Sequence, residues 1–383
     1  MSNAVRAMVA GYVENFKDKL EYIVDTLYKN PELSFNEEKS SEILISILKD
    51  EGFKITENVA NINYSFKAEY GSSSPKIAYL CEYDAVKNMG HANGHNITSA
   101  INLGAAVGLK RGIEKIGGSV VLIGCPAENK YPSKIVMLSE GVFSDVDAII
   151  CGHAMDKTCE SGSSLGMSIV DLTFIGRQAH SSLNLKEGIN AITPCVMLFN
   201  LIESLKNKYH HRGFINGIIT NGGDDISLIP GEVSCSFMVK SADKKVISDI
   251  LNQIINSADF TAKLYNCKVD YKVSEHEYLP LITNHDLSTI ACHNLKERGI
   301  INIHGSITSL ASLDIGNVSQ IIPTIHPYIG ICEEPTQYYS KEFADCTITS
   351  YAKENMLKAA CALALTGIDI IQNPDIIKKP LKN

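Results

Sequence analysis

The feature that most constrains the fold is an alternation of short apolar runs with helical segments in the first part of the chain. Four runs have the length and composition of strands: YSFKAEY, KIAYLCEY, SVVLIGCPAE and VDAIICGH. Helical periodicity is present at 4–29, 36–51, 97–115 and 133–141. Strands that alternate with helices predict a mostly parallel sheet covered on both faces.

The pattern changes near residue 165. A long alternating strand, GMSIVDLTFIGR, is followed by a helix, the strands GFINGIIT and EVSCSFMVKS, a second helix and the strand CKVDYKV. This β-α-β-β-α-β order is that of the ferredoxin-like split motif. We therefore predict a discontinuous α/β domain formed by 1–165 and 278–383, interrupted by a ferredoxin-like α+β domain at 166–277.

Composition excludes several classes of protein. The 383 residues carry a net charge of −8 and no basic stripe, which argues against a nucleic-acid partner. No apolar run approaches the roughly 18–20 residues that span a bilayer, and the N-terminus lacks a signal-peptide pattern. The eleven cysteines follow no framework spacing, so we interpret them as reduced thiols and expect a cytoplasmic location.

Polar groups gather where the predicted strands end, which is where open α/β sheets place their sites. The loop GHANGHN carries two histidines, each of which can be a metal ligand, a general base or a satisfied polar residue. Glu128 in CPAEN is placed for proton transfer, or caps a helix. His153 in CGHAMD has Asp156 nearby to orient it.

Two further stretches carry candidate groups. GRQAHSS places His180 at the start of the inserted domain, where a buried structural histidine is the alternative. DIGNVSQIIPTIHPY places Asp314, Asn317 and His326 in a loop-like segment.

These blocks, in this order, resemble the aminoacylase/amidohydrolase family of zinc peptidases. The most similar branch contains p-aminobenzoyl-glutamate hydrolase and the indole-acetyl-amino-acid hydrolases. The similarity covers nearly the whole chain, from NPELSFNEE through EYDAVKNMGHANGHN, CPAEN, GRQAHSSLNLKEGINA and GNVSQIIPTIHPYI to YSKEFAD. The resemblance implies a zinc-binding α/β domain interrupted by a lid domain, with a homodimer formed through the lid.

The resemblance also implies five metal-ligand positions, of which this chain keeps His95 and His153. The family's loop reads Gly-His-Ala-Cys-Gly-His-Asn, and Asn93 stands in the cysteine position. The family's acidic pair is Pro-Ala-Glu-Glu, and Asn129 stands in the position of its second glutamate. The last ligand is the histidine of a His-Ser/Thr-x-Glu-Phe pattern, and here Tyr339 replaces it.

These replacements argue against a two-metal site. Zinc prefers thiolate, imidazole or carboxylate donors, and two close dications need anionic ligands. An amide oxygen is a weak donor, and Tyr339 ligates only as a phenolate, whose usual pKa is about 10. We expect no cofactor, or at most a single weakly held zinc or manganese ion assisted by Asp84 or water. Cys151 is a possible substitute ligand, although packing is the favoured interpretation.

Other positions of the family's site are retained or altered. Glu128 occupies the general-base position, and His180 occupies that of the lid histidine that stabilises the oxyanion. Ser227 stands where the family has an asparagine that contacts substrate. We add Ser227, Asn317 and Tyr339 as candidate substrate-binding residues.

Three functions remain open. The first is a metal-dependent hydrolase of N-acyl or aminoacyl amides. The second is a metal-independent enzyme in which Glu128 and His180 carry out acid–base chemistry that forms or rearranges an amide bond. The third is a catalytically silent homologue that binds a small ligand or a partner. The favoured prediction is an amidohydrolase-like protein that acts on or binds an amide-type or amino-acid-like small molecule and is not a two-zinc hydrolase.

Overall fold

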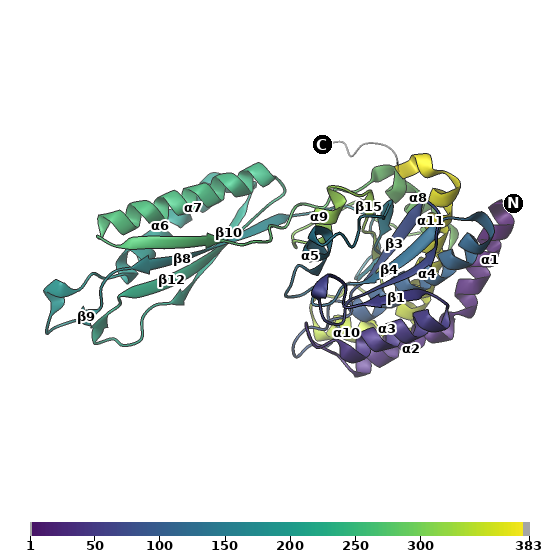
Figure 1. Ribbon diagram of the computed structural model, residues 1–383, viewed down its shortest axis with the longest axis horizontal. Helices are drawn as coiled ribbons and strands as arrows, with labels where there is room; N and C mark the ends of the chain where they lie inside the picture. The colour runs from purple at the N-terminus through teal and green to yellow at the C-terminus, as the bar shows by residue number, and fades with distance from the viewer. Residues whose placement is uncertain (1, 378–383) are drawn as a thin grey trace. The chain divides into compact units, whose positions relative to one another are not determined.

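The computed structural model describes residues 2–377 (Figure 1). The chain divides into two compact units. We call Met1–Ser163, Ile282–Thr308 and Asn317–Asn383 the large unit, and Ser164–Leu281 and Ser309–Gly316 the inserted unit. Each unit has its own buried apolar core, as expected of a domain.

The large unit contains a six-stranded sheet with the order β1-β2-β4-β3-β5-β15. Strands β4, β3, β5 and β15 are parallel, whereas β1 and β2 are antiparallel to their neighbours. The parallel sheet predicted from the alternating pattern is therefore confirmed, and β1 is an edge strand that the pattern did not indicate. The bounds are β1 Lys54–Glu57, β2 Phe66–Gly71, β3 Lys76–Cys81, β4 Ser119–Gly124, β5 Ala148–Ile150 and β15 Thr324–Ile325.

Short elements complete the large unit. Strands β6 and β16 form a separate parallel pair. The expected helix at 4–29 is two helices, because the chain breaks at Phe16. The remaining bounds are α1 Ser2–Asn15, α2 Lys17–Lys29, α3 Glu38–Asp50, η1 Val59–Asn61, α4 His95–Ile116, α5 Ser133–Ser139, β6 His153–Met155, α8 His285–Glu297, β16 Tyr328–Gly330, α10 Lys341–Cys346, α11 Ser350–Gln372 and η3 Pro374–Ile377. Three segments lie at the unit boundaries: β7 Ser163–Ser164, β14 Thr308–Ser309 and α9 Ile315–Ser319.

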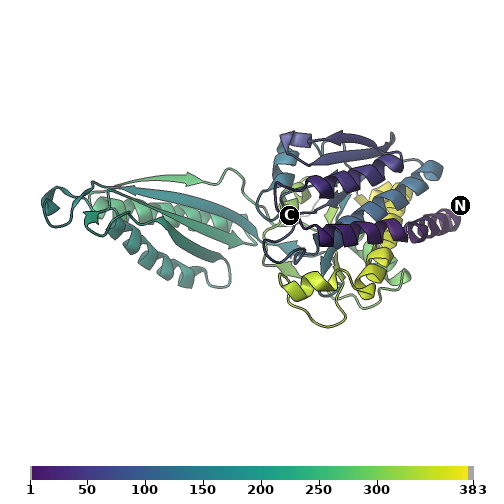
Figure 2. The ribbon, with the colours of Figure 1, turned by 90° about the horizontal axis from the view of Figure 1, so that it is seen from below.

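Helix α4 is the central helix of the large unit. It packs on β3 and β4 and is covered in turn by α1, α2 and α11 (Figure 2). Its glycines permit this close approach, since a Cβ at Gly108 would lie 2.5 Å from Val13 Cγ2 and 2.9 Å from Ala364 Cβ. The burial of this helix fixes its N-terminus, where His95 lies, against the ends of the parallel strands.

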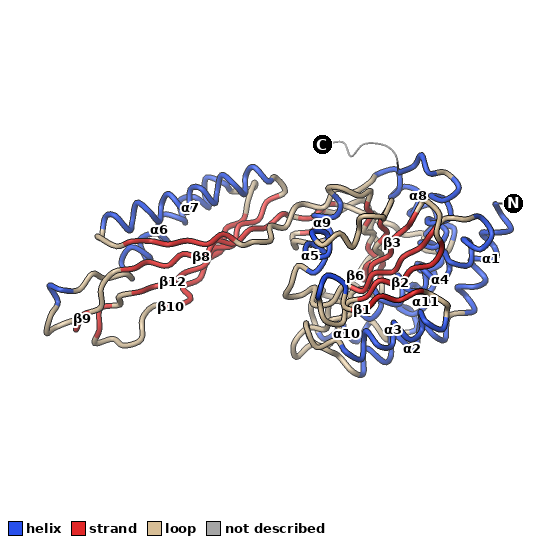
Figure 3. Tube along the Cα trace, in the orientation of Figure 1, coloured by secondary structure: helices blue, strands red, loops and turns tan. Residues whose placement is uncertain are grey.

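The inserted unit has the predicted β-α-β-β-α-β order. Its four antiparallel strands have the order β10-β12-β8-β13, and helices α6 and α7 lie on one face (Figures 1 and 3). Burial alternates along β8 and β12, as expected of a sheet with one covered face. The bounds are β8 Gly166–Ile175, β9 Ala179–His180, η2 Leu185–Glu187, α6 Ile192–Tyr209, β10 Phe214–Asn221, β11 Leu228–Ile229, β12 Glu232–Ser241, α7 Lys244–Leu264 and β13 Lys268–Val273.

None of the helices in the described part of the chain has the length and apolar character needed to cross a membrane. All eleven cysteines lie among the described residues and are free thiols.

Candidate functional site

The carboxyl ends of adjacent parallel strands bring the site together. Glu82 and Asp84 follow β3, Glu128 follows β4, and His153 follows β5. Because β4, β3 and β5 are neighbours and parallel, their ends meet at one edge of the sheet. His95 begins α4, which packs beneath the same strands.

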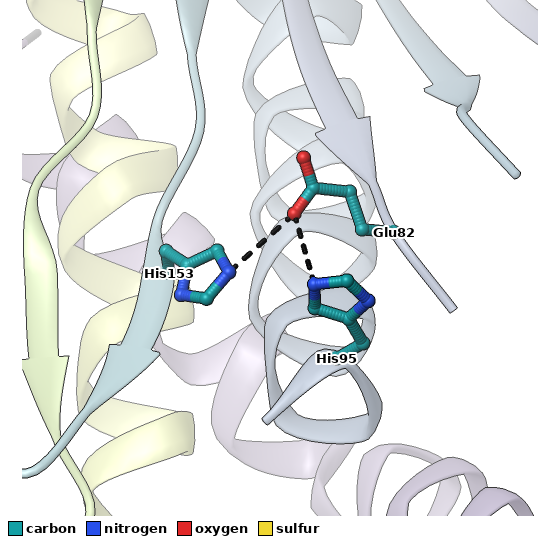
Figure 4. Close-up of side chains that lie close together, drawn as sticks. All are labelled: Glu82, His95 and His153. Carbon is teal, nitrogen blue, oxygen red and sulfur yellow. Dashed lines mark ion pairs between the residues drawn. The ribbon is translucent and has the colours of Figure 1, made fainter. Parts of the chain in front are cut away.

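Glu82 lies at the centre of this cluster. Its Oε2 is 3.5 Å from His95 Nε2 and 3.5 Å from His153 Nε2, and the two imidazoles approach it from different elements (Figure 4). Its Oε1 pairs with Lys134 Nζ at 2.7 Å. The ligand atoms of Glu82, His95 and His153 all lie within 4.8 Å of one another, a spacing at which the three could hold a metal ion.

The charge of Glu82 is maintained despite its burial. Burial alone would raise the pKa of this carboxyl. The positive charge of Lys134, and after it the charges of His95 and His153, outweigh burial and hold the pKa well below its usual range. Lys134 itself has no solvent exposure. A carboxylate that stays ionised in the interior is an anchor for a cation.

Asp84 orients His95. The Nδ1 atom of His95 lies 2.9 Å from Asp84 Oδ1 and 3.0 Å from the Asp84 carbonyl oxygen, and both of these atoms only accept. Asn93 Nδ2, a donor, also lies 2.9 Å from Nδ1; we assign the proton to Nδ1 because two acceptors, one of them a carboxylate, face it, and Nε2 is then directed at Glu82. Burial lowers the pKa of His95, but its hydrogen bond to Asp84 outweighs burial and raises the pKa to about 9. A carboxylate behind an imidazole is the usual support of a metal-binding histidine.

A backbone carbonyl orients His153 in the same way. Its Nδ1 lies 2.8 Å from the carbonyl oxygen of Ala154, so Nδ1 carries the proton. Burial lowers the pKa of His153 to about 3, which keeps the ring neutral and leaves a lone pair on Nε2. This lone pair and Glu82 Oε2 are two electron-rich atoms 3.5 Å apart, an arrangement that a cation stabilises.

The three replaced ligand positions are joined in a hydrogen-bond network. Tyr339 Oη donates to Asn129 Oδ1 at 2.7 Å, and Asn129 Nδ2 donates to Asp84 Oδ2 at 2.8 Å. Asn93 Nδ2 donates to the Asp84 carbonyl oxygen at 2.9 Å. The structure therefore brings Asn93, Asn129 and Tyr339 together around Asp84.

Two other candidate ligands, Tyr339 and Cys151, lie in surroundings that favour their protonated forms. Burial of its hydroxyl, followed by the nearby Glu128 carboxylate, raises the pKa of Tyr339 well above its ordinary value, which disfavours a phenolate. Burial raises the pKa of the Cys151 thiol in the same way, and its Sγ contacts the Leu80 carbonyl oxygen at 4.0 Å. The packing interpretation of Cys151 agrees with this environment.

Glu128 is half-buried beside the histidines, with its Oε2 3.8 Å from His95 Nε2. It follows Ala127, whose φ of +61° is unusual for a residue with a side chain. Glu37 Oε1 accepts a hydrogen bond of 2.6 Å from the Ala127 amide and so holds this turn in place. Glu37 comes from the NPELSFNEE stretch, so that block supports the turn that presents Glu128.

The remaining candidate residues come from other segments of the chain. His180 and Ser227 belong to the inserted unit, where Leu228 pairs with His180 and the Ser181 amide donates to the Ser227 carbonyl oxygen at 2.9 Å. Backbone amides of Ser182 and Leu183 donate to His180 Nδ1, which leaves Nε2–H as a donor.

In the large unit, Asn317 is half-buried in α9, whereas His326 is buried beside His153 with ring centroids 5.3 Å apart. The roles of all these residues stay proposals.

Sequence reasoning missed Glu82 and Lys134. The signal for Glu82 was present, since CEYD lies at the end of a strand, but only Asp84 was considered there. No local signal identifies Lys134, because a lysine in the first turn of a short helix ordinarily faces solvent.

Comparisons with known proteins agree on one family. Residues 163–265 match the model of a peptidase dimerisation domain of the M20 type. The chain is 25% identical to Xaa-Arg dipeptidase from Mus musculus, over 98% of this chain and 90% of that protein. It is 23% identical to a p-aminobenzoyl-glutamate hydrolase chain from Escherichia coli, over 96% of this chain and 92% of that protein.

A solved structure shares the fold. A dinuclear metal-binding peptidase of the M20 family from Bacillus subtilis superposes with a TM-score of 0.70 at 18% identity, over 94% of this chain and 99% of that one. Together with the dimerisation-domain match and the relatives that align along nearly the whole chain, this shared fold confirms the expected resemblance: the chain is similar in sequence to M20-type peptidases and amidohydrolases and has their fold.

Proposed function

We propose that this chain is an M20-type hydrolase of an N-acyl or aminoacyl amide with a single-metal centre formed by Glu82, His95 and His153. The observation that carries the proposal is the convergence of three ligand atoms, each within 4.8 Å of the others. Two imidazoles and one carboxylate are a common ligand set of catalytic zinc, with the fourth position left for water or substrate.

The orientation of the ligands supports this assignment. Both histidines have their Nδ1–H bonded to an acceptor, Asp84 in one case and the Ala154 carbonyl in the other. Both therefore direct Nε2 at Glu82 Oε2. Supported imidazoles of this kind lose little side-chain entropy when they bind an ion.

Glu82, His95 and His153 would hold a divalent ion, which would supply polarisation of a carbonyl oxygen and a lowered pKa of water. Glu128 then takes the proton from the attacking water and delivers it to the leaving amine, as a half-buried carboxylate beside the ligands can do. His180 offers its Nε2–H as a donor to the developing oxyanion. Ser227, Asn317 and Tyr339 are the proposed substrate contacts.

A single ion is proposed because the second set of ligands is altered. Asn93 and Asn129 are neutral, and hydrogen bonds to Asp84 and Tyr339 occupy their amides. Two dications in one site need more negative charge than these groups supply.

We further propose a homodimer through the inserted unit, which carries the dimerisation-domain match. A cytoplasmic location is proposed on the eleven free cysteines.

A second candidate is a metal-independent enzyme in which Glu128 and His180 form or rearrange an amide bond. The ion pair between Lys134 and Glu82 favours it, because this pair balances the charge of the carboxylate without a metal.

Metal content and turnover test the proposal together. Protein prepared without chelators, loaded with zinc or manganese and dialysed, is expected to retain one equivalent by elemental analysis and to hydrolyse members of a panel of N-acyl amino acids and dipeptides. Glu128→Gln should retain the metal and lose at least a hundredfold in kcat, whereas Glu82→Gln should lose the metal. Wild type that retains no metal, or full activity in Glu128→Gln, would refute the proposal.

A further inference from the structure

Lys134 is a fully buried lysine that the proposed reaction does not use. It lies in the first turn of α5, has no solvent exposure, and places Nζ 2.7 Å from Glu82 Oε1. Lysine is almost never buried unless it is paired, and a contact of this length between ammonium and carboxylate is a charge-assisted hydrogen bond. Lys134 is therefore part of the site.

The carboxylate oxygens of Glu82 and Asp84 show what this ammonium does. Asp84 Oδ1 accepts from His95, and Asp84 Oδ2 accepts from Ser34 Oγ and from the amide groups of Asn129. Glu82 Oε1 is taken by Lys134. Of these four oxygens, Glu82 Oε2 is the one that faces two histidine nitrogens, Nε2 of His95 and Nε2 of His153.

We propose that the Lys134 ammonium is a built-in cation of this site, which neutralises Glu82 and restricts the large unit to one metal ion. A second dication near Glu82 would meet a fixed positive charge and no remaining anionic oxygen of this carboxylate. The limit to one ion rests on the proposed metal centre, whereas the charge pairing with Glu82 does not.

Thermal unfolding and metal titration of Lys134→Met test the inference. In EDTA this variant leaves the buried Glu82 carboxylate without its lysine partner, so its Tm should fall by at least 5 °C. Its affinity for zinc should rise at least tenfold, because the repelling ammonium is gone and both oxygens of Glu82 are open to the ion. Wild type should bind no more than one equivalent even at excess zinc.

Two further variants make the test specific. Lys130→Met removes an exposed lysine from the turn that precedes α5 and should change neither Tm nor affinity. Lys134→Met combined with Glu82→Gln removes both charges and should recover most of the lost Tm. If Lys134→Met does not fold, recovery of folding in the double variant supports the charge pairing, and failure to recover overturns it.

The outcomes separate the two proposals. In one outcome, Lys134→Met lowers the Tm, the double variant recovers it, and neither wild type nor any variant binds metal. This outcome would support Lys134 as the internal cation and refute the metal centre. In another outcome, wild type binds one equivalent of zinc, and Lys134→Met has the same Tm and the same zinc affinity as wild type. This outcome would overturn the inference about Lys134 but would still support the metal centre. Two equivalents in wild type would overturn the limit that we assign to Lys134.

Discussion

Glu37 should make the stability of the large unit depend on pH. Its side chain has no solvent exposure, Oε1 accepts from the Ala127 amide at 2.6 Å, and Oε2 has no partner among the described residues. Burial is the largest cause that raises the pKa of this carboxyl, from 4.5 to about 7. The folded protein therefore holds a proton on Glu37 at pH values where the unfolded chain has released it.

The sign follows from this difference. A raised pKa contributes stability that is fully present below pH 4.5 and is lost as pH rises to about 7. At about 1.4 kcal/mol per pH unit the loss is at most about 3 kcal/mol, and relaxation of the interior reduces it to about 1–3 kcal/mol. Glu37→Gln is neutral at every pH and should remove this part of the pH dependence.

Urea unfolding at pH 5, 6, 7 and 8 measures the effect as the free energy of unfolding. Three buried histidines act in the opposite direction, because burial lowers the pKa of His91 and His153 to about 3 and that of His326 to about 4. These histidines are present in both proteins, so their contribution cancels when the free energy of unfolding of wild type is subtracted from that of Glu37→Gln at each pH. The exposed neighbour Glu38, changed to Gln, is the control. Equal slopes in Glu37→Gln and wild type between pH 5 and 8 would refute the reasoning.

Two other substitutions test how the site is held. Asp84→Asn removes the carboxylate behind His95, so metal affinity measured by calorimetry should weaken about 10–100-fold. The pKa of His95 measured by NMR should fall from about 9 toward its ordinary range. An unchanged metal affinity would contradict the orienting role of Asp84. Gly94→Ala should destabilise the protein by about 1–3 kcal/mol, because φ is +74° and the new Cβ would lie 2.7 Å from Ala154 Cβ. Gly90→Ala, with φ of +66° and no atom within 4 Å, is the matched control for the backbone strain, and an equal loss in both variants would exclude the steric contribution.

Local sequence signals were sufficient for the architecture. Period-two and helical patterns each depend on neighbouring residues, so the parallel strands and the β-α-β-β-α-β order of the inserted unit could be predicted from the chain alone. The break at Phe16 was missed, because apolar residues continue at helical spacing across it. The assignment of retained and replaced ligand positions rests on short contiguous motifs and stays a prediction, although the structure does bring His95, His153, Asn93 and Asn129 to one edge of the sheet.

What the sequence by itself determined is the family resemblance, the layered fold and a set of polar residues at the ends of strands. Only the tertiary structure decided which of them meet. It brought Glu82 between His95 and His153, joined the amide replacements to Asp84, and placed the Lys134 ammonium against the carboxylate. The physical reason is that burial and charge pairing depend on elements far apart in the chain: α5 and the end of β3 meet only when the sheet is formed, and no spacing along the sequence records that contact.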